Sequence, residues 1–529
     1  LVSFASAAAY TWDGGDNTST GWATATNWST DIAPAATGDT LTFAGTNNLS
    51  AVNNVVTSLA TAGTAITFAS GAGAFSLSGN ALTLGSGGGG GQTIISQQSA
   101  NNQTISANIN LSGGNGDRSI VFGAGAGSLT LSGNIAFNGD WLFPTTAAGT
   151  IILSGANTGD GKTTNAITAG TNVMRAMMRN NVAGTQLMLG SDGALGNVGT
   201  GTAVAGTASL RGIIANQNMK IGTANGNRDL SGSSLAINAG NIDFNGTSNL
   251  TIGNIVTVAG NRDFLVSSTG AVTVAGGIFL SADQTGRQLY VNLSGTGGMV
   301  VNGTISDTFH SGGVTTGSST FRKGGTGMMT LNGNSSYTGA TQIDAGTLKI
   351  GHANALGATG TTSATNLAGG TLDLNGFTIG ETVNITVNST LANTGAAAQL
   401  TADTNLTANL IVNATGDITA TRLIGSAAIR TITKLGNGTL TTNGTSHNNL
   451  AAWDVQAGTV VLANTSGYGA DRGVAINGGT LNVSGSINST SGITVNGATS
   501  GAAVTPPAAA EATHDVLRLK YLDGGHGEG

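Results

Sequence analysis

Short alternations of apolar and polar residues recur along the whole chain. Each places Val, Ile, Leu or Phe at every second position and is bounded by Gly, Asn or Ser. Alternation of period two is typical of a β-strand with one buried face. The predicted strands are Thr40–Phe43, Phe75–Leu77, Leu82–Leu84, Leu129–Leu131, Ile242–Phe244, Val256–Val258, Val272–Val274, Leu289–Leu293, Leu372–Leu374, Ile385–Val387, Leu481–Val483 and Ile493–Val495.

The polar positions of these strands carry Thr or Asn rather than charged residues. Parallel strands stack about 4.8 Å apart, so a column of like charges would repel, whereas Thr and Asn columns can hydrogen-bond along the stack. Gly-Asn, Asn-Gly and Ser-Gly pairs between the strands suit tight bends, because Gly and Asn tolerate a positive φ. The pattern predicts a stack of short parallel strands.

One stretch departs from this pattern. Residues Asn172–Asn181 combine Met174, Met177 and Met178 with Arg175 and Arg179. Their spacing favours a short amphipathic helix, packed on the flank of the fold or open to a partner.

A longer motif occurs twice. It runs from Lys323 to Leu348, and a degenerate copy opens at Lys434, 111 residues after the first lysine, and closes at Ala457–Val460. Register over such a distance predicts a solenoid, in which each unit buries its apolar face against its neighbours.

The first copy resembles the autotransporter-associated β-strand repeat of bacterial surface and secreted proteins. The resemblance rests on Lys323, Gly325, Gly327, Leu331, Gly333, Asn334, Tyr337, Gly339, Thr341, Ile343, Gly346, Thr347 and Leu348. The second copy keeps Lys434 and Gly458 but lacks the tyrosine. The resemblance implies an all-β fold, a right-handed parallel β-helix (solenoid), exported to the cell surface or beyond.

The two ends differ from the middle. Trp12, Trp22 and Trp28 fall within the first thirty residues, and they predict a cap that plugs the exposed edge of the first turn. Leu1–Ala9 reads as the end of a signal peptide or as an apolar first strand. We therefore expect a signal remnant and cap over residues 1–60, the β-helix over 61–500, and a tail over 501–529.

The tail begins with a stiff spacer at Pro506 and Pro507 and continues into a predicted strand. Such a strand can pair with the open edge of a neighbouring chain, which gives a head-to-tail filament. As assembly residues we predict Val516, Leu517, Leu519 and Tyr521 of the tail, together with Trp12, Trp22 and Trp28 of the cap.

Composition narrows the classes of function. Of the 529 residues 87 are Gly and none is Cys, only 8% are charged, and the net charge is −6. The absence of cysteine excludes disulfides and Cys-type metal sites. With no cluster of Lys and Arg, the chain does not suit nucleic acid or an anionic membrane as partner. No run approaches the roughly 18 apolar residues of a membrane span.

Candidate catalytic residues are scattered. Glycan cleavage needs two close carboxylates, and stacking would bring some acids together, for example Asp344 and Asp373 if they occupied adjacent turns. The histidines show no metal-ligand spacing; they are His310, His352, His447, His514 and His526. Gly113–Asp117 and Asn157–Gly161 are only weakly similar to calcium-binding turns. We expect no catalytic, cofactor or metal residues.

The sequence thus favours a non-enzymatic extracellular rod, either a self-assembling surface filament or a matrix or adhesion protein. Its expected partners are further copies of itself, with a glycan or a host-cell surface as possible targets. A polysaccharide-binding or polysaccharide-cleaving β-helix and a monomeric adhesin passenger stay open as alternatives.

Overall fold

The fold was analysed in a computed structural model. It describes residues 7–34, 38–55, 58–60, 63–85, 91–112, 116–138, 140–159, 162–164, 174–195, 210–230, 232–280, 285–307, 317–360, 363–425, 430–443, 452–463, 473–483, 493–496, 503–505 and 519–522. The chain divides into two compact units. The first comprises residues 1–285, 294–298 and 308–315, and the second comprises 286–293, 299–307 and 316–529.

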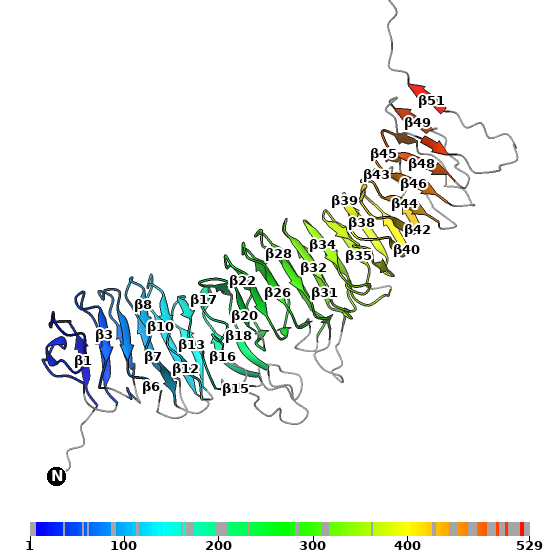
Figure 1. Cartoon of the computed structure of the whole chain (residues 1–529). Coiled ribbons are helices and arrows are strands. Elements are labelled where there is room, and N and C mark those ends of the chain that lie inside the picture. The colour runs from blue at the N-terminus through cyan, green and yellow to red at the C-terminus, as the bar shows by residue number, and fades with distance from the viewer. Residues whose placement is uncertain are drawn as a thin grey trace, which may run out of the picture. The chain divides into compact units, whose positions relative to one another are not determined.

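The first unit is a coil of stacked parallel strands (Figure 1), in which two long sheets form two faces and two separate groups of strands form the third. The first sheet stacks β1 (Ala9–Trp12), β2 (Thr40–Phe43), β4 (Ile66–Phe68), β7 (Gln92–Gln97), β10 (Asp117–Phe122), β13 (Trp141–Thr145), β16 (Met174–Asn180), β18 (Leu210–Ala215), β21 (Ser234–Ile237), β24 (Val256–Val258) and β27 (Ile278–Phe279).

The second sheet of this unit stacks β3 (Ser50–Asn53), β5 (Ser76–Gly79), β8 (Gln103–Ile105), β11 (Leu129–Leu131), β14 (Thr150–Leu153), β17 (Thr185–Leu189), β19 (Met219–Thr223), β22 (Ile242–Phe244) and β25 (Arg262–Val266). The third face holds β6 (Leu82–Leu84), β9 (Ile109–Leu111) and β12 (Ile135–Ala136), and later β20 (Arg228–Leu230), β23 (Leu250–Ile252) and β26 (Val272–Val274). A 3₁₀ turn, η1 (Ala25–Asn27), lies in the N-terminal loop, and β15 (Lys162–Thr164) pairs antiparallel with β16.

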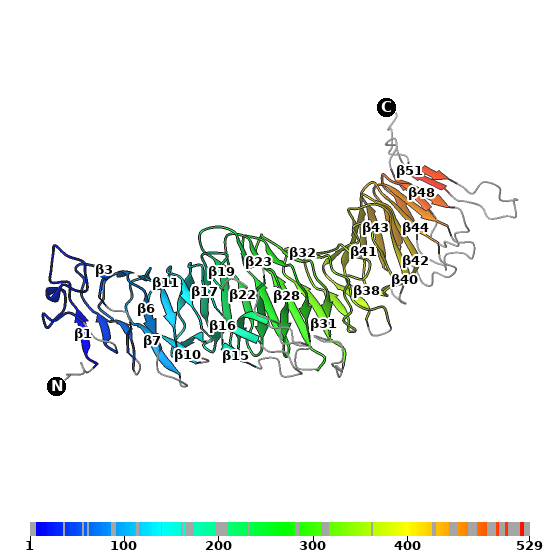
Figure 2. The ribbon, with the colours of Figure 1, turned by 60° about the horizontal axis from the view of Figure 1, so that its bottom comes forward.

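In the second unit the chain alternates between two long sheets, and some of their strands, such as β40, β42 and β44 of one and β41 and β43 of the other, are labelled in Figure 2. One stacks β28 (Gln288–Leu293), β31 (Thr320–Gly324), β33 (Thr341–Ile343), β35 (Thr365–Ala368), β37 (Thr378–Ile379), β38 (Val383–Val387), β40 (Ala398–Leu406), β42 (Ile418–Gly425), β44 (Thr439–Thr442), β46 (Thr459–Leu462), β48 (Thr480–Val483) and β50 (Ala503–Thr505).

The other sheet stacks β29 (Met299–Val301), β32 (Met328–Leu331), β34 (Thr347–Ile350), β36 (Thr371–Asp373), β39 (Ser389–Asn393), β41 (Leu410–Ala414), β43 (Thr431–Leu435), β45 (Ala452–Val455), β47 (Val474–Ile476), β49 (Ile493–Asn496) and β51 (Leu519–Leu522). The short strand β30 (Ile305–Ser306) also belongs to this unit.

The register confirms the parallel β-helix. Arg228, Leu250 and Val272 begin three successive strands of one face and pair with one another in sequence, so a turn takes 22 residues there. Inward positions of the strands are buried and outward positions are partly exposed, as in β22 and β26. The twelve predicted strands coincide with observed strands to within two residues at each end.

Columns of asparagine hydrogen-bond along the stack, as the sequence predicted. The Asn384 amide donates to Asn366 Oδ1 at 2.8 Å, and the Asn405 amide donates to Asn384 Oδ1 at 2.9 Å. At the turns, Asn227 Oδ1 accepts from the backbone N–H of Asn249 at 3.0 Å, one turn later. Asparagine therefore links successive turns both within strands and between them.

The helix expected at Asn172–Asn181 is wrong. Met174–Asn180 forms β16, which lies between β13 and β18 in the first sheet and also pairs with β15. Met177 and Met178 are buried in the coil, with 1% and 0% exposure. Three partner strands bond to its backbone, and this tertiary pairing outweighs the weak helical pattern of one short segment.

The β-helix also exceeds the range of 61–500 expected from the sequence. The parallel ladder already includes β1 at Ala9–Trp12, which pairs with β2. Its last described strands are β50 and β51, which pair with β48 and β49. Both expected end regions therefore contribute strands to the ladder.

Candidate functional site

The lysine that opens the first repeat is a buried cross-turn clamp. Lys323 is 0% exposed, and its ammonium donates to the carbonyls of Gly325 at 2.8 Å, Gly327 at 2.6 Å and Ala345 at 2.7 Å. An ammonium has three donors and no acceptor, so three carbonyls satisfy it completely. Because Ala345 follows β33, the strand stacked on β31, the clamp ties one turn to the next.

The second lysine repeats this arrangement. Lys434 is also 0% exposed, and its ammonium donates to the carbonyls of Leu435 at 2.8 Å, Gly436 at 2.7 Å and Ala457 at 3.4 Å. Burial lowers the pKa of both lysines to about 8. The negative charge of a carboxylate acts in the opposite direction and raises the pKa, that of Asp344 for Lys323 and that of Asp417 for Lys434. The clamps therefore combine complete hydrogen bonding with desolvation of the charge.

The closing glycines of the repeat make room for the clamps. Gly346 and Gly458 adopt φ values of +62° and +66°, in the region that favours glycine. A Cβ on Gly346 would lie 2.4 Å from Lys323 Nζ, and one on Gly458 would lie 2.7 Å from Lys434 Nζ. The repeat thus requires glycine for both its backbone conformation and its space.

The two clamps lie on different sheets. Lys323 in β31 pairs with Ile343, whereas Lys434 in β43 lies between Val412 and Val455 on the other sheet. Between the copies, β40 pairs with β37 through its first part and with β38 through its second. The two copies of the motif, 111 residues apart, therefore share the same local clamp but lie on different sheets of the coil.

Other repeat residues build the core of the same turn. Leu331, Leu348 and Tyr337 are at most 1% exposed. The Tyr337 hydroxyl hydrogen-bonds to Thr341 Oγ1, which in turn donates to the Leu356 carbonyl at 3.0 Å. Burial raises the pKa of Tyr337 far above its usual value. At the backbone, a Cβ on Gly325 would lie 2.2 Å from the Leu293 carbonyl.

Sequence reasoning missed Asp307, which anchors the loop before this tyrosine. Its carboxylate, 4% exposed, accepts hydrogen bonds from the Ser319 N–H at 3.2 Å and from the Thr338 N–H and hydroxyl at 2.8 and 2.6 Å. A single Asp carries no pattern of its own in the sequence. Its role follows only from the fold, which brings residues 319 and 338 to it.

The three N-terminal tryptophans form the interior of the cap. Trp12, Trp22 and Trp28 are 0%, 0% and 1% exposed. The rings of Trp12 and Trp28 meet edge to face at 5.2 Å, and Trp28 Nε1 donates to the Trp22 carbonyl at 2.9 Å. Because the chain itself buries them, these side chains stabilise the cap from inside, and their role in assembly stays a prediction.

The tail strand is described only in part. Val516 and Leu517 lie outside the described residues. Leu519 and Tyr521 belong to β51, where they pair with Ile493 and Val495 of the same chain. The tail strand thus extends a sheet of its own coil, and its pairing with another chain stays a prediction.

Asp344 and Asp373, the example of two acids that would meet on adjacent turns, have separate partners. Asp344 forms an ion pair with Arg322 and accepts from the Gln342 amide at 2.7 Å. Asp373 lies 3.8 Å from Lys349 Nζ and accepts from Thr394. Each carboxylate is thus held by a cation of its own.

The described part of the chain offers little for a metal ion. There, no three His, Cys, Asp or Glu side chains lie close enough to hold a metal ion together. His352 Nδ1 accepts a hydrogen bond from the Asn354 N–H at 3.0 Å; His310, His447, His514 and His526 lie outside the described residues. Parts of Gly113–Asp117 and Asn157–Gly161 also lie outside them.

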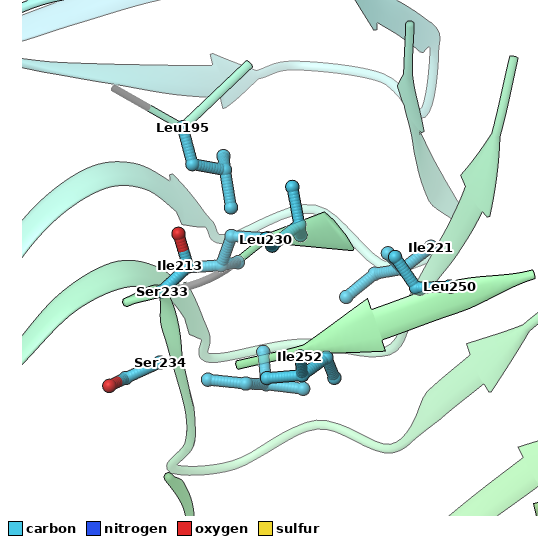
Figure 3. Close-up of a pocket in the computed structure, with 9 residues that line it drawn as sticks. Leu195, Ile213, Ile221, Leu230, Ser233, Ser234, Leu250 and Ile252 are labelled. Atoms are coloured by element: carbon cyan, nitrogen blue, oxygen red, sulfur yellow. The ribbon is translucent and has the colours of Figure 1, made fainter. Parts of the chain in front are cut away.

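A small gap occurs in the interior of the first unit (Figure 3). It measures about 10 Å³ and is lined mainly by aliphatic side chains: Leu195, Ile213, Ile221, Leu230, Leu250 and Ile252. The Ser234 hydroxyl points away from these side chains in Figure 3. A volume of this size, with so little polar lining, is a packing gap rather than a ligand site.

The outer surface of the second unit carries a polar column along the first of its sheets. Tyr290, Arg322, Gln342, Asn366, Asn384 and Asn405 follow one another in register. The Arg322 guanidinium lies over the Tyr290 ring, 4.9 Å from its centroid. We call these six residues the amide column.

Within the described residues, no helix is long and apolar enough to cross a membrane.

Comparison with known proteins identifies the repeat. Residues 321–350 match the family model described as the passenger-associated-transport-repeat. A segment of 83 residues is 42% identical to the adhesin BmaC autotransporter of Brucella suis biovar 1 (strain 1330). That segment is 16% of this chain, and the chain spans only 2% of the relative's length. No solved structure matches the chain significantly. The resemblance to an autotransporter-associated repeat is confirmed.

Proposed function

We propose that this chain is the rod of an adhesin-type passenger that acts outside the cell, either secreted or at the cell surface. The observation that carries the proposal is the place of the passenger-associated repeat. Residues 321–350 supply strands β31 to β34 of a continuous parallel ladder. The relative with a similar segment is named an adhesin and an autotransporter.

We further propose that the work of the rod is mechanical and not catalytic. Support comes from the carboxylates of the second unit, where Asp344, Asp373 and Asp403 are each paired with a basic residue. Hydrolysis of a glycan requires two carboxylates that share one substrate bond. Incubation of the protein with plant and algal polysaccharides should release no reducing sugar; release above a heat-inactivated sample would refute this part.

Self-association into head-to-tail filaments is the finer proposal. Because Leu519 and Tyr521 pair with β49 of their own chain, a second chain would add to the other edge of β51 rather than replace this strand. Backbone hydrogen bonds at a sheet edge join strands without a specific side-chain sequence.

Negative-stain microscopy of the purified full chain tests this arrangement. We expect fibres from the full chain and single rods from a variant that lacks residues 505–529. Fibres of equal length and number from the truncated variant would exclude the tail. A monomeric mass for the full chain over a wide concentration range would favour a monomeric adhesin passenger.

Glycan binding is a second candidate function, favoured by the amide column. Stacked aromatic and guanidinium planes beside a row of amides offer the flat and polar contacts that a sugar chain needs. Binding of the protein to a glycan array should fall in Tyr290→Ala and Asn384→Ala. Thr441→Ala, on a different part of the sheet, is the control and should bind normally. Equal binding by all three variants would remove the amide column as the binding surface.

A further inference from the structure

The amide column has a fixed geometry that bears on the kind of ligand it can hold. Asn366, Asn384 and Asn405 lie in register on three stacked strands, and each is partly exposed. The Asn384 amide donates to Asn366 Oδ1, and Asn384 Oδ1 accepts from the Asn405 amide. Both bonds run in the same direction, so the three side-chain amides are aligned along the stack.

These bonds leave part of each amide for a ligand. A primary amide carries two N–H donors and an oxygen with two lone pairs. Asn384 uses one donor and one lone pair within the column, so one of each stays unused by it. Because the same bonds hold the amide planes in place, a ligand does not have to order these side chains, and this lowers the entropic cost of binding.

The spacing of these groups repeats once per turn. Successive strands of the sheet lie about 4.8 Å apart, so the column offers a donor and an acceptor at that interval. From Tyr290 to Asn405 it covers five such steps, a length of about 24 Å. A sugar unit in an extended, β-linked polysaccharide is about as long as one step, and its hydroxyl groups both donate and accept. Such a chain can bond to turn after turn when it lies along the stack.

The charges beside the column are paired. Arg322, a member of the column, forms an ion pair with Asp344. Arg422 forms an ion pair with Asp403, which lies two positions before Asn405. Each guanidinium is thus compensated by a carboxylate. The surface therefore offers no excess of positive charge from these groups to attract sulfate or uronate groups.

Small aliphatic groups border the column on its other side. Thr386 and Thr407 are exposed and follow two of the asparagines by two positions. Their hydroxyls donate to backbone carbonyls of the preceding turn at 3.0 and 2.9 Å, so these side chains add aliphatic surface rather than free donors. Val387 beside them is 51% exposed. We call these three residues the aliphatic strip.

We propose that the amide column binds a neutral, linear, β-linked polysaccharide that lies along the stack with about one sugar unit per turn. This inference rests on glycan binding by the amide column and narrows it to uncharged chains, in preference to sulfated or uronic-acid chains. The amides of Asn366, Asn384 and Asn405 bind hydroxyl groups of successive sugar units. The aliphatic strip contacts the C–H groups of the rings.

Calorimetric titration of the full chain tests the class of ligand. The probes are β-1,4-linked oligomers of glucose, xylose or mannose with two to six units. Affinity for the preferred sugar should rise about tenfold or more from the dimer to the tetramer, because more turns are engaged. It should be insensitive to salt, since no charge is involved. An α-1,4-linked glucose hexamer, which coils instead of extending, is the matched control and should bind at least tenfold more weakly.

Variants of the protein place the ligand on the column. Asn384→Ala should weaken binding of the preferred hexamer about tenfold. The matched control is Asn413→Ala, because Asn413 is exposed on the other sheet of the same unit; it should bind as the wild type does. If Asn384→Ala does not fold, the dependence of wild-type binding on chain length and linkage decides instead.

The outcomes separate this inference from glycan binding in general. Tighter binding of a heparin hexamer, lost at high salt, would overturn the neutral class while glycan binding itself stands. Equal affinity for dimer and hexamer, or for α- and β-linked chains, would exclude a ligand that extends along the stack. Unchanged binding by Asn384→Ala would remove the column as the site. Failure of every oligosaccharide to bind would refute both the neutral class and glycan binding.

Discussion

The clamp at Lys323 allows a sharp test of what holds successive turns together. We consider Lys323→Met, which keeps a similar chain length and removes the ammonium. Three buried carbonyls, those of Gly325, Gly327 and Ala345, then lose their donor. Leaving a buried acceptor unsatisfied costs about 1–3 kcal/mol.

Part of this loss is offset, because the substitution also removes the cost of burying a charge, the same cost that lowers the pKa of Lys323. We therefore expect a net loss of about 3 kcal/mol in local stability. Since a solenoid turn contacts only its neighbours, the loss should be concentrated in the turns around residues 321–350.

Hydrogen exchange with mass spectrometry measures this local stability directly. Amides of β31 to β34 should exchange on the order of a hundredfold faster in Lys323→Met than in the wild type, which corresponds to about 3 kcal/mol. The matched control is Lys349→Met, because Lys349 lies in β34 of the same repeat with a side chain that is 30% exposed. In the control, the free energy of local opening derived from the exchange rates should change by less than about 1 kcal/mol. Equal exchange in the two variants would refute the clamp.

Three further outcomes are expected. Because the pKa of Lys323 and Lys434 is about 8 in the folded chain and 10.5 in the unfolded chain, the unfolded chain binds more protons between these values, so stability should rise with pH there. Urea unfolding at several pH values measures how steeply the free energy of unfolding rises with pH, and the rise should be smaller in Lys323→Met. A free energy of unfolding that falls with pH in this range would contradict the argument. Asp140→Ala should destabilise the first unit by about 3–5 kcal/mol, since Arg118 Nε lies 3.1 Å from Asp140 Oδ2 with both side chains 0% exposed. Hydrogen exchange of the backbone amides of β10 and β13 measures this loss. An unchanged exchange rate would show that the ion pair does not stabilise the unit. Gly346→Ala should destabilise its repeat by more than about 1 kcal/mol, because a Cβ would lie within 2.5 Å of Lys323 Nζ and of two carbonyls; a neutral effect in thermal unfolding would show that the turn relaxes freely.

Much of the candidate site was visible in the sequence, but its chemistry was not. The repeat motif marked Lys323, Gly346 and Tyr337, and all three proved to be parts of two stacked turns. The pattern did not show that the lysine binds carbonyls. A long side chain with a terminal charge is usually exposed, and only the closing glycine of the next turn leaves space for the ammonium.

The sequence by itself determined the strands and the nature of the stack. These features are local, since alternation fixes which side chains point inward and Gly or Asn fixes where the chain bends. Tertiary structure decided which strand lies on which. Lys323 and Lys434 share a motif but lie on different sheets, because β40 pairs with two consecutive strands between them. The hydrogen bond from Thr338 to Asp307 depends in the same way on contacts between turns. Partners distant in sequence are set by how many residues each turn uses, and a small change in that number moves a motif to another face.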